Sequence, residues 1–370
     1  MQLERRIEAS RALLVAAPFV AVAFTLLVTS VLVAWAGAPV GRAYALLLEG
    51  GFGSRFALTE TMTRATPLML TGLAAAVAFR ARLFNIGAEG QLYLGALAAV
   101  AVGGLSGGTG GVGYSVSPWL LMPAMLLAAM FAGALLLLGP ALLKSRFGVD
   151  EVVTTLLANF IVLLFVSAML DGPMKDPTAM GWPQSVALQD ALQFDKLIER
   201  SRVHTGLLIA LVLAVALWAL LRFTTLGFEI RAVGANPRAA AFAGMPVTGT
   251  LVKVALLSGA LAGLAGAVEV AGRTGYVTLD MSPGYGYGGI VIAMLAGLNP
   301  LAVVAAAVFV AGIQVGADSM SRAVAVPTYV ADVIVAVALL AMLVATLLAH
   351  YRLRLRVRPR VPIKPSTGSA

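Results

Sequence analysis

The sequence predicts an all-α polytopic membrane protein with about ten transmembrane helices. Of its 370 residues, 60% are hydrophobic and only 12% are charged, and the mean hydropathy is +0.94. Soluble domains carry about 25% charged residues, so this composition excludes an ordinary soluble protein. Because a membrane helix needs about 20 apolar residues, the sequence divides into windows close to that length. The windows are 15–36, 63–80, 84–103, 118–139, 151–170, 204–222, 249–270, 285–298, 300–317 and 328–349.

Three of these windows leave alternatives open. The first favours an uncleaved span over a signal peptide, because it is longer than the 7–15 apolar residues of a signal-peptide core. Ala34-Trp35-Ala36 resembles a cleavage site and keeps the signal-peptide alternative open. The windows 285–298 and 300–317 are short and joined only by Asn299-Pro300. They predict half-helices, a re-entrant pair or two full spans.

The distribution of Lys and Arg predicts that both termini lie in the cytoplasm. Basic residues concentrate in every second segment between the windows, as they do in cytoplasmic segments of membrane proteins. The sequence therefore predicts one transmembrane domain over 1–350 and a basic cytoplasmic tail over 351–370. A long external segment is expected over 171–203. Its second part, 187–202, is expected to form an amphipathic helix on the membrane surface.

The residue inventory excludes several kinds of active site. There is no cysteine, and the two histidines, His204 and His350, are far apart in the sequence. No lysine follows a glycine, so the chain lacks a nucleotide-binding P-loop. The net charge of +9 comes largely from basic residues at span ends, which favours a membrane role over nucleic-acid binding. We expect no catalytic residue, no cofactor and no metal site.

Polar residues inside predicted spans are candidates for function, because they are costly in a membrane. The motif NIGAEGQ places Asn85, Glu89 and Gln91 at the start of the third window, where residues four apart share a helix face. These side chains either cap the helix start or line a transport path. Asn159, in the middle of the fifth window, either joins two helices or binds a substrate.

A second glycine-rich group precedes the eighth window. Tyr285 and Tyr287 alternate with glycines in the motif SPGYGYGG, which is typical of a broken or tightly packed membrane helix. The tyrosines either stack on a planar ligand or mark the membrane interface. Both glycine-rich groups follow a small-residue helix, which indicates a weak internal repeat with two breaks near one site. Glu269, Gln314 and Asp318, near external span ends, are expected to contact water.

The segment 226–247 is a polar island between two apolar windows. Its sequence, LGFEIRAVGANPRAAAFAGMPV, places Glu229, Arg231 and Arg238 among many small residues. Such charges are costly on a lipid-facing helix, and so many alanines favour a helix over a plain loop. The distribution of basic residues places the island in the cytoplasm. We therefore expect a short helix that contacts a separate protein motor.

Three separated motifs resemble one protein family. FNIGAEGQLYLGALAA, GVDEVVTTLLANFI and GFEIRAVGANPRAAAFAGM are similar to permease subunits of bacterial ABC importers for nucleosides and simple sugars, within the ribose and branched-chain amino acid permease group. The resemblance covers roughly residues 60–345. The chain length and the long external segment resemble those of the larger of the two permeases in purine-nucleoside systems. The resemblance implies a single permease domain with the type II (vitamin B12-type) importer fold.

The resemblance also implies partners and residue roles. The permease would lie in the bacterial inner membrane beside a second permease, identical or paralogous, and would bind a cytoplasmic ABC ATPase and an external substrate-binding lipoprotein. The segment 227–244 matches the family's coupling helix, which docks in a groove of the ATPase. The candidate coupling residues are Gly227, Arg231, Ala232, Gly234, Asn236, Ala239, Ala240 and Gly244. The candidate residues of the translocation path are Asn85, Glu89, Gln91, Asn159, Tyr285 and Tyr287.

The favoured function is inward transport of nucleosides, with purine nucleosides first, by alternating access driven by a separate ATPase. One alternative is an ABC permease for a simple sugar such as ribose. A second alternative is an ion-coupled secondary transporter, since such transporters also use broken helices. A membrane enzyme is disfavoured, because no acid–base pair or metal-binding cluster stands out in the sequence.

Overall fold

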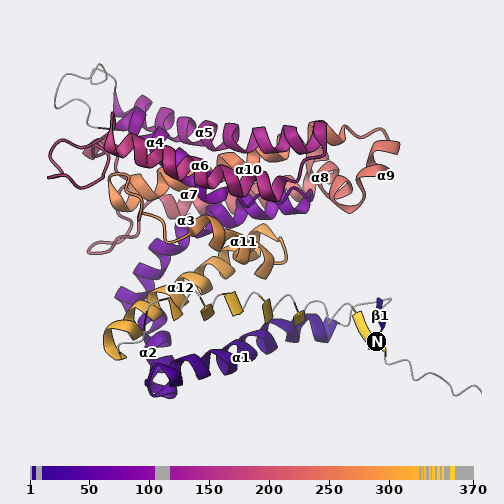
Figure 1. Cartoon of the computed structure of the whole chain (residues 1–370), viewed down its shortest axis with the longest axis horizontal. Helices are drawn as coiled ribbons and strands as arrows, with labels where there is room; N and C mark the ends of the chain where they lie inside the picture. Colours follow the sequence, from indigo (N-terminus) through magenta and orange to yellow (C-terminus); the bar gives the residue numbers. More distant parts are fainter. Residues whose placement is uncertain are drawn as a thin grey trace, which may run out of the picture.

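The described secondary structure is almost entirely helical (Figure 1). This computed structural model describes residues 2–5, 11–104, 117–324 and 351–354, with parts of 327–345. Two short strands, which the sequence pattern did not predict, pair antiparallel. The elements are β1 (Gln2–Arg5), α1 (Arg11–Trp35), α2 (Val40–Phe52), α3 (Arg55–Arg80), α4 (Ala88–Gly103), α5 (Pro118–Phe147), α6 (Glu151–Asp171), η2 (Asp190–Leu192), α7 (Gly206–Phe223), α8 (Thr225–Ala235), α9 (Pro237–Phe242), α10 (Val247–Glu269), η3 (Val270–Thr274), α11 (Tyr285–Leu295), α12 (Pro300–Val324) and β2 (Tyr351–Arg354).

Within the described residues, six helices are long and apolar enough to cross a membrane. These are α3, α5, α6, α7, α10 with its η3 extension, and α12. The last part of α1, Ala23–Trp35, meets α2 at 114°, and this bent pair makes a seventh if it counts as one span. α4 and α11 are shorter apolar helices. Much of the tenth window, 328–349, lies outside the described residues, so the count of ten stays a prediction.

Helix boundaries differ from the predicted windows in several places. α3 begins at Arg55, well before residue 63, because the Ser54 hydroxyl accepts a hydrogen bond from the Ala57 amide and caps the helix (3.0 Å). α12 has 25 residues, so the prediction of a short ninth segment is wrong. The eighth segment, α11, is short, with 11 residues. α2 lies between the first two windows and has no counterpart among them.

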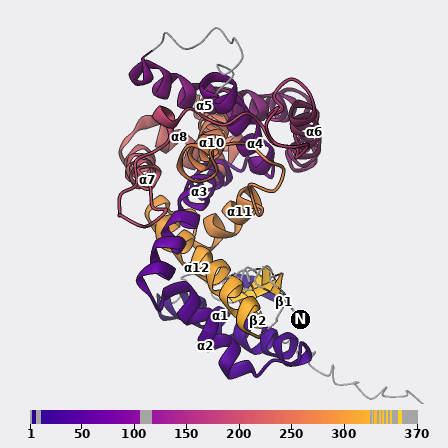
Figure 2. The same cartoon turned by 90° about the vertical axis from the view of Figure 1, so that its left-hand side faces the viewer.

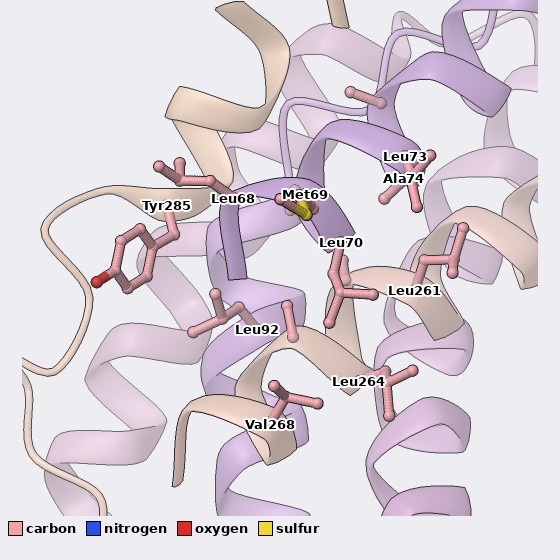
Figure 3. Close-up of a cluster of buried hydrophobic side chains, with 14 of the residues drawn as sticks. Leu68, Met69, Leu70, Leu73, Ala74, Leu92, Leu261, Leu264, Val268 and Tyr285 are labelled. Carbon is pink, nitrogen blue, oxygen red and sulfur yellow. The ribbon is translucent and has the colours of Figure 1, made fainter. Parts of the chain in front are cut away.

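The core forms where α10 packs directly on α4 and α5 at glycines. A Cβ atom on Gly95 would lie 2.2 Å from the carbonyl oxygen of Gly263, and one on Gly133 would lie 2.2 Å from that of Gly259. Small residues of this kind let membrane helices approach through their backbones. Leucines of α3, α4 and α10 are buried together in the main hydrophobic cluster (Figure 3).

α6 and α7 lie on opposite sides of this core (Figure 2). The apolar stretch of α3 is 89% buried and that of α10 is 72% buried, but those of α6 and α7 are only 22% and 28% buried. Because the exposed side chains of α6 and α7 are mostly apolar, their outer faces suit contact with lipid.

α1, α2 and α12 form a second hydrophobic cluster. α2 and α12 also approach through glycines, since a Cβ on Gly316 would lie 2.0 Å from the Leu47 carbonyl oxygen. Ile313, Ala317 and Met320 of α12 are buried in this cluster. α12 therefore connects the second cluster to the α3 side of the main core (Figure 2).

The segment 171–203 contains turns and one short 3₁₀ helix, η2, so the prediction of an amphipathic helix over 187–202 is wrong. Leu188 and Leu192 are fully buried. The Leu188 amide donates to the Gly275 carbonyl oxygen at 2.7 Å, and Ser185 exchanges hydrogen bonds with Val277. The segment therefore packs onto the connection between η3 and α11, because its apolar residues find burial there.

Replacing Gly266 by Ala should destabilise the core. The added Cβ would lie 1.9 Å from the Leu92 carbonyl oxygen, so α10 and α4 would have to separate. Overpacking of this kind costs about 1–3 kcal/mol. We expect a lower melting temperature for the detergent-solubilised protein, measured by intrinsic fluorescence.

Gly139→Ala in α5 is the matched control. A Cβ at position 139 meets no atom within 4 Å. Alanine favours a helix over glycine by about 1 kcal/mol, so the control should melt at the same temperature or slightly higher. Equal melting temperatures for Gly266→Ala and the unchanged protein would contradict the close α4–α10 contact.

Candidate translocation site at two helix breaks

The two glycine-rich groups of the sequence form two helix breaks that contact each other. The first break separates the end of α3 at Arg80 from the start of α4 at Ala88. The second separates η3, which ends at Thr274, from α11, which starts at Tyr285. The residue before α11, Gly284, has a φ of +85°, which L side chains rarely adopt.

Glu89 joins the two breaks. Its Oε2 accepts a hydrogen bond of 2.6 Å from the Gly286 amide in the first turn of α11. Gly286 permits this approach, because a Cβ there would lie 2.2 Å from the Glu89 backbone nitrogen. Glu89 is only 4% exposed. Its carboxylate therefore satisfies a backbone donor at a helix N-terminus, where negative charge is favoured.

Two hydroxyl groups, one from each half of the chain, each form a hydrogen bond with the helix break in the other half. Thr71 of α3 donates to the Tyr285 carbonyl oxygen at the second break, at 2.8 Å. Ser258 of α10 donates to the Ala74 carbonyl oxygen at 2.8 Å and accepts from Asn85 at the first break, at 3.1 Å. Thr71 and Ser258 occupy equivalent positions in the short motifs LTG and LSG. Each half of the weak repeat thus stabilises the break of the other half.

Asn85 pairs with Gln91, not with Glu89. The two side-chain amides exchange hydrogen bonds of 2.9 and 2.8 Å. Asn85 Oδ1 also accepts from the Gly87 amide at 3.0 Å. Asn85 lies before α4 begins, so the expectation that it shares a helix face with Glu89 is wrong. Its hydrogen bonds close the turn ahead of α4, but they do not cap the first amides of α4 itself.

Asn159 connects α6 to both breaks. Its Oδ1 accepts from the Gly90 amide at 2.8 Å, and its Nδ2 donates to the Ile86 carbonyl oxygen at 2.9 Å. The same Nδ2 donates to the Tyr287 hydroxyl at 3.1 Å. Asn159 is fully buried, whereas Tyr287 is 39% exposed. Asn159 thus joins helices, as one of its two predicted roles requires, and it also orients the exposed ring of Tyr287.

The same region contains a network of charged side chains, which the sequence pattern did not predict. Arg273 donates to Glu269 Oε1 at 2.5 Å and to the Tyr285 hydroxyl at 2.8 Å. Glu269 is fully buried, so the expectation that it contacts water is wrong. Arg64 pairs with Asp318 at 2.5 Å. The spacing of Glu269 and Arg273, four residues apart on a helix, could have predicted this ion pair from the sequence.

The network is not fully satisfied. Two of its buried atoms, Arg64 Nε and Glu269 Oε2, have no hydrogen-bond partner within the described residues. Unpaired buried polar atoms are costly and mark places where water or a polar molecule gains hydrogen bonds. No group of three or more His, Cys, Asp or Glu side chains among the described residues could hold a metal ion.

The polar island folds as two short helices, α8 and α9, not as the single helix predicted over 227–244. Asn236 divides them, because its Oδ1 accepts from the Arg238 and Ala239 amides at 3.1 Å each and so caps α9. Pro237 follows at the first position of α9, where its missing amide proton carries no cost.

The eight candidate coupling residues divide between two faces. Gly227, Gly234 and Ala240 are buried against the rest of the chain, and a Cβ on Gly234 would lie 1.9 Å from the Arg80 carbonyl oxygen. Ala232 is half-buried. The remaining four are exposed, namely Arg231, Asn236, Ala239 and Gly244. The sequence prediction did not include Phe242, which is 96% exposed on α9.

The chain matches, over residues 57–359, the family model described as branched-chain amino acid transport system / permease component. The chain belongs to this permease family. It is 36% identical over 326 residues to a guanosine ABC transporter permease of Bacillus subtilis, covering 87% of this chain and 91% of that protein. It is 38% identical to a glucose ABC transporter permease of Haloferax volcanii, covering 84% and 82%. It is 31% identical to a nucleoside ABC transporter permease of Lactococcus lactis, covering 82% and 84%.

Membership gives the permease its general role. It is a membrane-embedded permease subunit of an ABC importer, which implies partnership with an ATPase and a substrate-binding protein. The alternative of an ion-coupled secondary transporter is thereby set aside.

A solved ABC transporter of the metal-chelate type, in an inward-facing conformation, aligns with 79% of the permease and 82% of that chain, at 17% identity and a TM-score of 0.37. An alignment with this TM-score does not support the type II subtype.

Replacing Asn159 by Ala should destabilise the permease. The change leaves the Gly90 amide and the Ile86 carbonyl without their side-chain partner, at a cost of about 1–3 kcal/mol for each group. We expect a melting temperature several degrees lower in detergent. Leu164→Ala on the exposed face of the same helix, where the side chain is 73% exposed, should leave it unchanged. Equal melting of all three proteins would show that Asn159 does not hold the breaks.

Proposed function

We propose that this permease imports nucleosides, with purine nucleosides as the preferred class, by alternating access driven by its ATPase. The guanosine permease supports this choice most strongly, since the similarity covers 91% of that protein. The nucleoside permease of Lactococcus lactis supports the same class. A second candidate is a simple sugar, because the chain is 38% identical to the glucose permease of Haloferax volcanii.

Uptake measurements separate these substrates. Cells that express the permease with its ATPase and receptor should accumulate radiolabelled guanosine, and unlabelled adenosine should compete for uptake. Ribose and glucose at the same concentrations should not compete. Accumulation of labelled sugar with no guanosine uptake would establish the second candidate instead. A P-loop lysine variant of the ATPase is the control and should abolish either activity.

We propose that the translocation path runs past the two helix breaks. Asn85, Glu89, Gln91, Asn159 and Tyr285 are each at most 4% exposed, so their proposed part is to hold the breaks in shape. Tyr287 is the exposed member of the candidate set, and its ring offers a surface for stacking on a base. Substrate contact is therefore assigned first to Tyr287.

We propose that the permease lies in the bacterial inner membrane with both termini in the cytoplasm. The ends of α3, α5 and α7 that would face the cytoplasm carry Arg80, Lys144, Arg146 and Arg222, as the positive-inside rule expects. The proposal includes ten spans over 1–350, a type II fold, the external segment 171–203 and the cytoplasmic tail 351–370. A second permease, identical or paralogous, would complete the path.

We propose that α8 and α9 dock on the ATPase through the exposed face of α9. Phe242 supports this, because a large apolar side chain at 96% exposure is a typical anchor for a partner's pocket. Gly234 acts differently from the exposed residues. A bulky side chain there would strike the Arg80 carbonyl oxygen and displace α8 from the permease itself.

Replacing Phe242 by Ala should weaken the ATPase complex without unfolding the permease. Loss of an anchor residue costs about 2 kcal/mol, so we expect about 30-fold weaker binding of the ATPase and a matching loss of uptake. Co-purification and surface plasmon resonance measure the binding. Phe147→Ala, at the corresponding end of α5 and 75% exposed, is the control. Unchanged ATPase binding by Phe242→Ala would remove α9 from the proposed interface.

A further inference from the structure

Three arginines from three helices line one cavity beside α8. Arg80 is the last residue of α3, Arg222 lies in the last turn of α7, and Arg231 lies in α8. The cavity has a volume of about 590 Å³. Its other lining residues are apolar or uncharged and include Trp218 and Phe223. No carboxylate lines it, so the cavity concentrates positive charge.

The three guanidinium groups have no ion-pair partner within the described residues. Arg80 and Arg231 line the same cavity, so their like charges repel each other. Arg231 also donates a hydrogen bond to the Leu221 carbonyl oxygen, which holds it beside the end of α7. Arginine binds phosphate groups through paired hydrogen bonds, and an anion between these side chains would relieve their repulsion.

The cavity continues an apolar stripe on the outer face of α7. Leu208, Val212, Val215 and Phe223 are 49%, 65%, 54% and 70% exposed, and their spacing places them along one side of the helix. The rings of Trp218 and Phe223 pack edge to face at 5.5 Å beside the cavity. An apolar stripe that ends in a basic cavity matches a molecule with hydrocarbon chains and an anionic head.

We propose that this cavity binds the phosphate of an anionic phospholipid whose acyl chains lie along α7. Basic pockets at the ends of membrane helices bind such headgroups. The lipid would connect the ends of α3, α7 and α8 through one anion. It would therefore hold α8, which leads into the proposed ATPase contact on α9, against the permease. Lipid binding itself requires neither the ATPase nor the transported substrate.

Native mass spectrometry of the purified full-length permease tests the proposal. The protein is titrated with phosphatidylglycerol and with phosphatidylcholine of the same acyl chains. We expect phosphatidylglycerol to bind at least tenfold more tightly. Arg222→Gln should reduce that preference several-fold, and the double variant Arg80→Gln/Arg222→Gln should abolish it. Arg222 is exposed, so the single variant is expected to fold normally.

Arg146→Gln is the matched control, since Arg146 is exposed near the end of α5 and does not line the cavity. It should keep the full preference for phosphatidylglycerol. Equal binding of the two lipids, or equal loss in Arg146→Gln and Arg222→Gln, would overturn the site. Displacement of the lipid by millimolar inorganic phosphate would assign the cavity to a soluble anion. Release of the lipid on addition of the ATPase would assign it to an acidic side chain of that partner.

Discussion

The structure depends on satisfying backbone groups where two membrane helices break. A lipid environment offers no water to unpaired amides and carbonyls, so the protein must supply their partners. Glu89, Asn85 and Asn159 accept hydrogen bonds from the Gly286, Gly87 and Gly90 amides. Each break can persist because Asn85 within the first break, and Glu89 and Asn159 from neighbouring helices, supply these partners. The polar residues of this region thus have a structural reason to be present before any substrate is considered.

The same residues limit how a substrate can use the region. Asn85 and Gln91 already satisfy each other, and Glu89 is committed to α11. A passing molecule would have to break these bonds to reach those side chains in this conformation. The unpaired atoms of the charged network, Glu269 Oε2 among them, carry no such cost. Glu269 is itself fully buried, so reaching this atom would require the surrounding helices to move.

The sequence predicted most of the helices and both helix breaks, because apolar length and glycine-rich polar motifs are local signals. It also located the polar island. It did not predict the split at Asn236 or the burial of Glu269, since these depend on which helices pack together. α2 was missed because 13 residues with a mixed composition give no clear window. The hydrogen bonds between Asn85 and Gln91 were not predicted, because they depend on the turn before α4, which residue spacing does not specify.

Backbone contact between α4, α5 and α10 has a mechanical consequence. Side chains at an interface can change rotamer and absorb a displacement, but glycine backbones at Gly95, Gly133, Gly259 and Gly263 cannot. These three helices must then move as one rigid body during the transport cycle. Any hinge then lies outside this group, for example in the connection 275–284 between η3 and α11.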